Sequence, residues 1–422
     1  FFYKYNYMKE SNARTYSRKF PKVFTTGKGC YLFDNEGNEY MDCLACAGAL
    51  SLGHNHKIVK IAMLDYVLSD APQQMLDLST NIKINFINEV YKWLPTDMQN
   101  YCYQCCGPSG SDAVEASLKL VRIATGRSTI ISFSGGFHGQ TLGSLQHMGN
   151  LNAKTQLHLP IHMTHILPYP NSHHCKLSNN DILNLLEEIL TDAESGIALP
   201  AGVIVEAVQG EGGVVVAPFE WLYGVYEICK KYNIPLILDE VQAGFLRTGK
   251  PFAFMHSNII PDVVVMSKAL GGSQPLAMIV YNPKLDTWGA GAHTGTFRGN
   301  QLAMYTGHKV LEYIRTSNFE ERVTTNGMYF INELNNLRNK FIQHIIEIRG
   351  IGLMIGILIG TNNIFDGDKA KLIQKRLFEE QKLIIECGGR NGSVLRFLGS
   401  LEITKSEIDK IVTKLDAVLS GL

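Results

Sequence analysis

The chain has 422 residues, of which 45% are hydrophobic and 18% charged, and its 39 basic and 39 acidic side chains give a formal net charge of zero. This length is enough for two or three domains with a large buried core, so a small disulfide-stapled scaffold is excluded. The balanced charge and the lack of basic runs argue against nucleic acid as a partner. The longest nearly apolar stretch, residues 351–360, is too short to cross a membrane and is interpreted as one buried strand.

Nine cysteines occur without regular spacing, mostly among small or apolar residues. Cys102, Cys105 and Cys106 form a Cys-x-x-Cys cluster, but no second pair follows that would complete a zinc site. We therefore expect free thiols on a strand that enters a loop, without disulfides or a metal. Residues 1–11 lack the apolar core and cleavage site of a signal peptide, so a cytoplasmic location is expected.

The alternation of apolar and polar residues over 31–42, around an Asn-Glu-Gly turn, predicts a β-hairpin. From about residue 81 to residue 285, short β-branched runs alternate with helical segments such as 219–232. This alternation predicts an α/β domain with a mostly parallel central sheet and helices on both faces. Its buried strands are expected within 129–133, 202–208, 235–241 and 261–268.

The last hundred residues have a different pattern. Helices are expected at 319–341 and 368–381, short strands near Ile384 and at 394–398, and a final helix at the end of the chain. We expect this part to pack with the N-terminal segment as a smaller α+β domain. The predicted division is 1–70 for the N-terminal part of the small domain, 71–315 for the large domain and 316–422 for the C-terminal part.

Three charged residues fall at the predicted carboxyl ends of buried strands, where ligands bind in open α/β sheets. Glu206 lies late in GVIVEAV, Asp239 ends the apolar run PLIL, and Lys268 directly follows VVVMS. Charges that interrupt apolar runs are costly unless they are paired. One interpretation is therefore a buried structural ion pair between Lys268 and one of the acids.

A second pattern indicates a ligand. The Gly/Ser-rich turn CGPSGS directly precedes an amphipathic helix, and backbone N–H groups at such a start, with the hydroxyls of Ser109 and Ser111, can bind a phosphate. A desolvated lysine such as Lys268 has a depressed pKa and can form a Schiff base with an aldehyde. Together these features predict pyridoxal 5′-phosphate as a cofactor.

The same cofactor requires two further groups. A carboxylate beside the pyridine nitrogen keeps that nitrogen protonated, and Asp239 fits this role. An aromatic ring must cover one face of the pyridine, and Phe137 with His138, just after the strand TIISF, can supply it. For His138 taken alone, a hydrogen-bonded loop histidine is the ordinary interpretation.

These residues resemble the class III, ornithine-aminotransferase-like group of pyridoxal-phosphate aminotransferases, which has fold type I. The resemblance covers nearly the whole chain, and its most specific part is LDEVQAGFLRTGK followed by PDVVVMSKALGG, around Asp239 and Lys268. It implies catalytic roles for these two residues. For the remaining cofactor contacts it implies Gln242 at the 3′-hydroxyl side, Gly110 and Ser111 at the phosphate, and Phe137 stacked on the ring, with His138 and Glu206 nearby.

The resemblance also implies a homodimer with shared active sites, because Thr296 corresponds to a threonine that reaches the phosphate in the neighbouring subunit. Arg396 and Glu211 occupy the positions of an arginine that binds the substrate α-carboxylate and a glutamate that swings onto this arginine. A bidentate guanidinium is the natural partner of a carboxylate. A surface salt bridge of Arg396 is the alternative. Gly399 and Ser400 replace the usual Pro-Pro of the family.

Within the family, the segments ESNARTYSRKFPKVF, CGPSGSDAVEA and GAGAHTGTFRGNQLAM look most like diaminobutyrate:2-oxoglutarate aminotransferases. This likeness implies interconversion of L-glutamate and L-aspartate 4-semialdehyde with 2-oxoglutarate and L-2,4-diaminobutyrate by a ping-pong mechanism. The alternatives are an ornithine, acetylornithine or 4-aminobutyrate aminotransferase. An aminomutase or a racemase of the same fold is a further alternative, which would turn over without any 2-oxo acid. A non-catalytic binding relative is less well supported, because the lysine and the aspartate that such relatives usually lose are both retained.

Overall fold

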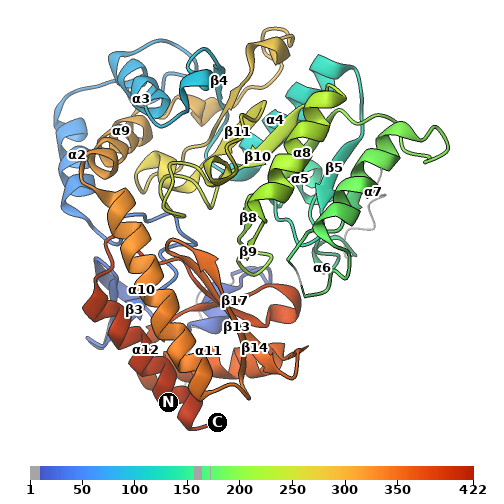
Figure 1. The fold of residues 1–422 in the computed structure, drawn as a ribbon. Coiled ribbons are helices and arrows are strands. Elements are labelled where there is room, and N and C mark those ends of the chain that lie inside the picture. Colours follow the sequence, from blue (N-terminus) through green and yellow to red (C-terminus); the bar gives the residue numbers. More distant parts are fainter. Residues whose placement is uncertain (1–9, 156–163, 172) are drawn as a thin grey trace.

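The computed structural model describes residues 10–155, 164–171 and 173–422 (Figure 1). The start of the chain, on which the expectation about a signal peptide rests, lies largely outside these ranges. Within them, no helix combines the length and the apolar character needed to cross a membrane. The large sheet occupies the upper part of Figure 1, and the orange and red C-terminal helices occupy the lower part.

The large sheet has seven strands in the order β4-β12-β11-β10-β7-β5-β6. All neighbours pair in parallel except β12, which runs antiparallel to both β11 and β4. The prediction of a mostly parallel sheet is therefore confirmed. The strands are β4 (Cys102–Cys105), β5 (Ile130–Phe133), β6 (Thr164–Leu167), β7 (Gly202–Val205), β10 (Leu236–Asp239), β11 (Val263–Met266) and β12 (Met278–Tyr281).

Helices cover both faces of this sheet because its strands are apolar on both sides. In β10, Ile237 packs with the residues of α4 in one buried cluster, whereas Leu236 and Leu238 pack with those of α8 in another. The helices of this part are α2 (Lys57–Leu68), α3 (Asn81–Tyr91), α4 (Gly110–Thr125), α5 (Leu142–Gln146), α6 (Asn152–Thr155), α7 (Asn179–Thr191), α8 (Phe219–Lys231) and α9 (Gln301–Thr316).

The two ends of the chain meet in smaller sheets. One has the order β1-β2-β3-β16, in which β16 of the C-terminal part pairs in parallel with β3 of the N-terminal part. The other has the order β13-β14-β18-β17, with β15 paired to β14. The strands are β1 (Phe24–Lys28), β2 (Tyr31–Asp34), β3 (Glu39–Asp42), β13 (Ile345–Ile351), β14 (Met354–Thr361), β15 (Ile364–Phe365), β16 (Leu383–Ile384), β17 (Glu386–Gly388) and β18 (Val394–Phe397).

Four helices belong with these sheets: α1 (Tyr16–Lys19), α10 (Phe319–Lys340), α11 (Gly367–Gln381) and α12 (Lys405–Ser420). The predicted hairpin over 31–42 is confirmed, since β2 and β3 pair antiparallel. The prediction of one strand over 351–360 was wrong, because a turn at Gly352 separates β13 from its antiparallel partner β14. Gly352 has φ +58°, and a Cβ there would lie 2.6 Å from the backbone of Thr248, so only glycine permits this turn.

Candidate active site

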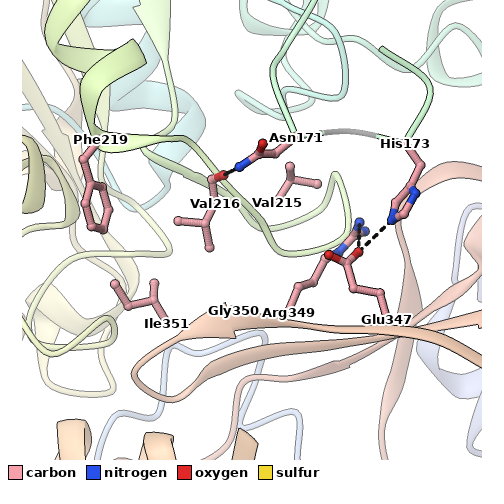
Figure 2. Close-up of a pocket in the computed structure, with 9 residues that line it drawn as sticks. All are labelled: Asn171, His173, Val215, Val216, Phe219, Glu347, Arg349, Gly350 and Ile351. Carbon is pink, nitrogen blue, oxygen red and sulfur yellow. Dashed lines mark hydrogen bonds and ion pairs between the residues drawn. The ribbon is translucent and has the colours of Figure 1, made fainter. Parts of the chain in front are cut away.

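A cavity of about 150 Å³ lies at the carboxyl ends of β10 and β11, where the strand register places Asp239 and Lys268. It brings together every residue that the sequence proposed for the cofactor except Ser109 and Thr296. Its lining is Gly110, Ser111, Val114, Phe137, His138, Gly139, Glu206, Glu211, Asp239, Val241, Gln242 and Lys268. A larger cavity of about 670 Å³, drawn in Figure 2, contains none of these residues.

Lys268 begins a 3-10 helix, η3 (Lys268–Gly271), directly after β11. Its φ of +47° is left-handed, a strained conformation of the kind that functional sites retain. Among the residues that the structure describes, no carboxylate forms an ion pair with Lys268, so the interpretation as a structural ion pair was wrong. Burial lowers the pKa of the Lys268 amine, which favours the uncharged, nucleophilic form.

The carboxylate of Asp239 is held by the residues around it. Its Oδ2 lies 2.9 Å from Nδ1 of the buried His138, and its Oδ1 accepts a hydrogen bond of 3.1 Å from the backbone N–H of Val241. Burial alone would lower the pKa of His138, but the hydrogen bond and the charge of Asp239 outweigh burial and raise it. His138 therefore orients Asp239 through a contact that the sequence did not predict.

Glu206 follows β7 and connects two loops of the cavity. Its Oε1 accepts a hydrogen bond of 2.9 Å from the backbone N–H of Phe137, and its Oε2 accepts one of 3.1 Å from that of Gly210. Burial raises the pKa of Glu206 to about 7. The side chain thus fixes the loop that carries Phe137 relative to the loop that carries Glu211.

The amino-terminal end of α4 faces the cavity. Ser109 caps this helix through a capping box with Asp112, and Gly110 and Ser111 of its first turn form part of the cavity wall. A Cβ on Gly110 would lie only 2.9 Å from Cγ1 of Val241, so a larger residue would fill this space. This end of α4 could hold a phosphate.

Gln242 lines the cavity as well. Its Nε2 lies 3.4 Å from Oε1 of Glu211, whereas its buried Oε1 has no hydrogen-bond partner in the described part of the chain. Buried polar atoms are rarely left unpaired, so an unpartnered oxygen at a cavity wall fits a polar group of a ligand. With the buried amine, the oriented carboxylate and the helix start, it gives donor and acceptor groups suited to a phosphorylated, nitrogen-containing aldehyde.

Arg396 lies beside this cavity, on β18. Its side chain is fully buried, so the alternative of a surface salt bridge was wrong. Its Nη1 and Nη2 donate to the two carboxylate oxygens of Glu211, each at 2.8 Å, and Nη2 also lies 2.7 Å from Oε2 of Glu386. Burial would raise the pKa of Glu211, but the charge of Arg396 outweighs burial and lowers it. Glu211 therefore covers Arg396 as a bound carboxylate would.

Glu211 also lines an open cavity of about 1270 Å³ that includes Lys19 and Arg390. Because this one side chain lies in the walls of both cavities, it separates the buried amine from the wider opening. Turning it away from Arg396 would expose the guanidinium to a molecule that enters from that opening.

Two features near Arg396 were not found from the sequence. Tyr16, on α1, is close enough that the carboxylates of Glu386 and Glu211 add to burial in raising the pKa of its hydroxyl. Lys19, one turn further along the chain, forms an ion pair of 3.6 Å with Glu386. No periodicity in this short polar segment indicates that it packs over a site 380 residues away.

The departure from the family pattern after Arg396 does not leave the loop unsupported. The carbonyl oxygen of Gly399 accepts a hydrogen bond of 2.6 Å from Nη1 of the buried Arg247, and the hydroxyl of Ser400 accepts one of 3.1 Å from the backbone N–H of Glu402. Thr296 begins the short 3-10 helix η5 (Thr296–Gly299) and is exposed, outside the cavity of its own chain.

One group of possible metal ligands, Glu89, His308 and Glu312, occurs in the part of the chain that the structure covers. Buried Glu89 already pairs with Arg315 at 2.7 Å and with Lys92 at 3.0 Å. These two cations neutralise the carboxylate that a metal would need. The nine cysteines are free thiols, and Cys102 and Cys105 lie on β4.

The fold is that of aminotransferases with solved structures. An aminotransferase of Bacillus anthracis superposes with a TM-score of 0.88 at 24% identity, over 98% of this chain and 96% of that one. A transaminase of a marine Virgibacillus gives 0.88 at 20% identity, over 99% and 97%. At this level of identity the likeness establishes the fold alone, which is α/β of fold type I.

Comparison of the sequence identifies the family more specifically than comparison of the fold does. A family model described as Aminotransferase class-III matches residues 13–419, and the chain belongs to this family. It is 43% identical to a diaminobutyrate--2-oxoglutarate aminotransferase of Haemophilus influenzae, over 96% of this chain and 92% of the relative. A Rhizobium meliloti protein of the same name is also 43% identical, over 98% and 91%. A diaminobutyrate--2-oxoglutarate transaminase of Sporosarcina pasteurii is 37% identical, over 95% and 93%.

Proposed function

We propose that this aminotransferase interconverts L-glutamate and L-aspartate 4-semialdehyde with 2-oxoglutarate and L-2,4-diaminobutyrate, using pyridoxal 5′-phosphate in a ping-pong reaction. The observation that carries the proposal is the bidentate pair of Glu211 and Arg396 next to the buried amine of Lys268. Such a pair lets one cavity accept two kinds of amino donor, one with a carboxylate beside the reacting amine and one without. The names of the relatives with 43% identity support this choice of substrates.

The cofactor fits the residues present. Lys268 would hold it covalently, Asp239 would keep a proton on its ring nitrogen, and Gly110 and Ser111 at the start of α4 would bind its phosphate. Phe137 would stack on the ring. When bound, pyridoxal phosphate supplies an electron sink that stabilises the negative charge left after a proton leaves the substrate carbon.

The remaining contacts complete this arrangement. Gln242, with its unpartnered Oε1, would face the 3′-hydroxyl side of the ring. His138 would act through Asp239, and Glu206 through the two loops that it joins. Lys268, Asp239 and Phe137 would then each have one role toward the cofactor.

The residues of the chain divide the reaction between them. With glutamate, the α-carboxylate would displace Glu211 from Arg396. The Lys268 Nζ would then act as the base that takes the proton from the substrate α-carbon. With diaminobutyrate, Glu211 stays on Arg396, so the α-carboxylate site is closed and the distal amine lies next to Lys268. Rotation of the Glu211 side chain would thus decide whether the α-amine or the distal amine of a substrate lies next to Lys268.

We also propose a homodimer with shared active sites. Exposed apolar side chains gather near Thr296, whose neighbour Phe297 is 58% exposed, and the backbone N–H of Met75 donates to the carbonyl of Gly299 in the same region. The exposed apolar side chains of this surface and of α2 are Ile61, Leu64, Val67, Leu68, Leu76, Leu78, Ile84 and Phe297. Exposed apolar side chains such as these fit contact with a second copy of the chain, in whose cavity Thr296 would reach the phosphate.

A hybrid-dimer experiment tests the shared site. Lys268→Ala and Thr296→Asp chains are expected to be inactive alone, but mixing them after dissociation should restore activity. In the hybrid, the cavity with an intact lysine receives its threonine from the Lys268→Ala chain. If Thr296 served the cavity of its own chain, no mixture would recover activity, and the shared site would be rejected.

The substrate assignment is tested by the visible spectrum of the purified protein. L-2,4-Diaminobutyrate, ornithine, acetylornithine and 4-aminobutyrate are added separately, followed by 2-oxoglutarate, with Lys268→Ala as the control. We expect diaminobutyrate to bleach the cofactor band rapidly and 2-oxoglutarate to restore it. Another amine in this role would make the substrate assignment wrong, turnover without any 2-oxo acid would indicate an aminomutase or racemase, and the lack of a visible band would reject the cofactor.

The role of Arg396 is tested separately. An Arg396→Ala variant should lose most of its rate with glutamate, because the α-carboxylate loses its bidentate partner. A variant that kept the wild-type rate of the glutamate half-reaction would disprove the exchange of Glu211 for substrate.

A further inference from the structure

The segment that carries Glu211 is a short loop, residues 210–214, between the paired strands β8 (Val208–Gln209) and β9 (Val215–Val216). Its conformation is unusual. Gly213 has φ +104°, and the next residue, Val214, is fully buried with φ +55°. A β-branched residue in the left-handed region is a strained conformation that persists only where the surroundings fix it.

The C-terminal part of the chain supplies the contacts that fix the loop. Nε of Arg349, on β13, donates a hydrogen bond of 2.8 Å to the carbonyl of Gly213, and the backbone N–H of Gly389 donates one of 2.9 Å to the carbonyl of Glu211. A Cβ on Gly213 would lie 2.8 Å from Nη2 of Arg349 and 2.9 Å from the Cα of Gly389. The loop is therefore enclosed between these two residues.

Arg349 is itself oriented. Its side chain is only 12% exposed, and its Nη1 lies 3.5 Å from Oε2 of Glu347. The same oxygen lies 2.9 Å from Nε2 of His173. Figure 2 shows Glu347 between His173 and Arg349, beneath the hairpin that carries Val215 and Val216. Glu347 thus holds Nη1 of the Arg349 guanidinium, while Nε donates to the loop.

From these contacts we propose that Arg349 is a positioning residue for Glu211. By holding the carbonyl of Gly213, two residues further along the loop, it keeps the backbone in place so that the Glu211 carboxylate returns to Arg396 with both oxygens bound. This inference rests on the proposed function, in which Glu211 covers Arg396 while the distal amine reacts. Arg349 touches neither the reacting atoms nor Arg396.

The inference has a chemical consequence in the choice of amine. If the loop is loosened, the α-carboxylate of diaminobutyrate competes better for Arg396, and the α-amine then lies next to Lys268. Its amino group is transferred to the cofactor and water supplies the oxo oxygen, as in the normal reaction, but the product is 4-amino-2-oxobutanoate instead of aspartate 4-semialdehyde. Glutamate should bind more easily, because its carboxylate displaces Glu211 at a lower cost.

The test compares Arg349→Met with Arg338→Met as holoenzymes. Arg338, on α10, is a matched control because its Nε also donates to a backbone carbonyl, that of Ile346, at 2.8 Å and without contact to the loop. In Arg349→Met the ratio of distal to α-amine products should fall about tenfold, the effect of losing one charge-assisted hydrogen bond. The KM for glutamate should fall while kcat changes little, and Arg338→Met should match the wild type in both.

The conservative Arg349→Lys, which retains a donor near Gly213, should recover part of the product ratio. Should Arg349→Met fail to fold, Glu347→Gln replaces it, because Glu347 is 38% exposed and orients Arg349 from outside. We expect Glu347→Gln to shift the product ratio in the same direction by a smaller factor. A folded Arg349→Met, or in its place Glu347→Gln, with the wild-type product ratio and KM would overturn the inference.

Glu211→Ala separates this inference from the proposed function. If Glu211→Ala loses the preference for the distal amine and Arg349→Met retains it, the positioning role is wrong and the proposed function stands. If the wild type prefers the distal amine and Glu211→Ala keeps that preference, the role of Glu211 is wrong and the inference fails with it. If Glu211→Ala and Arg349→Met both lose the preference for the distal amine, the proposed function and the positioning role of Arg349 are both supported.

Discussion

Two groups of charged side chains lie on either side of the same cavity, and they are assembled in different ways. Lys268, Asp239 and Glu206 follow neighbouring parallel strands of one sheet, so the strand register alone brings them to one edge. Arg396 lies on β18. The two carboxylates that pair with it belong to Glu386 on β17 and to Glu211 in the loop between β8 and β9. The first group depends on one sheet, and the second depends on how two parts of the chain dock.

The two groups also differ in how their cations are paired. Lys268 has no ion pair among the described residues, and burial lowers the pKa of its amine. Arg396 is held by Glu211 and Glu386, whose charges outweigh burial and raise the pKa of the guanidinium. Pairing thus decides which cation can give up its proton and react, and which remains charged and binds carboxylates.

The largest effect is expected where the unpaired cation is removed. Lys268→Ala should lower the rate of both half-reactions by roughly four orders of magnitude, because it removes the group that moves the proton. Stopped-flow absorbance with each amino donor measures this loss. The exposed Lys250→Ala should retain the wild-type rate, and a Lys268→Ala enzyme within tenfold of the wild type would contradict the assignment.

Removing the paired cation should instead reduce stability. Arg396→Met leaves the carboxylates of Glu211 and Glu386 without their partner, which should lower the free energy of unfolding by about 3–5 kcal/mol. Urea unfolding at fixed protein concentration measures this change. The control is Arg376→Met, which removes an exposed pair with Glu380 and should cost less than about 1 kcal/mol.

The same contrast explains what could be predicted from the sequence. Asp239 and Lys268 were found because each follows a continuous apolar run, and such runs are strands buried on both faces. Glu211 and Arg396 were found only through a resemblance, because no local pattern indicates that a loop at residue 211 meets a strand at residue 396. The turn at Gly352 was missed since glycine within an apolar run is also compatible with a straight strand.

Side-chain partners were harder to predict than positions. The hydrogen bond between His138 and Asp239 was not predicted, because it joins residues 101 positions apart in the chain. Tyr16 belongs to a short polar segment and Arg349 to a mostly apolar strand, and neither composition indicates the contacts that these two residues make. Register along a strand is determined by nearby residues, whereas contacts between separate sheets depend on the whole packed chain.

A pH dependence of stability would sharpen the contrast, because Glu206 of the first group should contribute to it. Burial raises the pKa of Glu206 from 4.5 to about 7, so the folded state keeps a proton that the unfolded chain has lost. The folded state then binds more protons, and the free energy of unfolding should decrease as the pH rises from 4.5 toward 7. His138, with a raised pKa, acts in the same direction because stability present at low pH is lost as its proton leaves.

Urea unfolding over this pH range measures the slope for the wild type and for Glu206→Gln, which should flatten it. Glu220→Gln, an exposed substitution at the start of α8, should leave the slope unchanged. An identical slope in Glu206→Gln and the wild type would show that Glu206 titrates normally in the folded state.

The smallest effect is expected at the edge of the second group. Tyr16 lies near Glu386, which also binds Arg396, and the Glu386 carboxylate adds to burial in raising the pKa of the Tyr16 hydroxyl. In Tyr16→Phe, Glu386 should bind Arg396 more strongly and make it less available to a substrate carboxylate. We expect the KM for glutamate to rise about threefold, the effect of losing one weak polar contact, with little change in kcat. Tyr223→Phe, a similarly exposed tyrosine on α8, is the control, and equal KM values in the two variants would exclude Tyr16 from the carboxylate site.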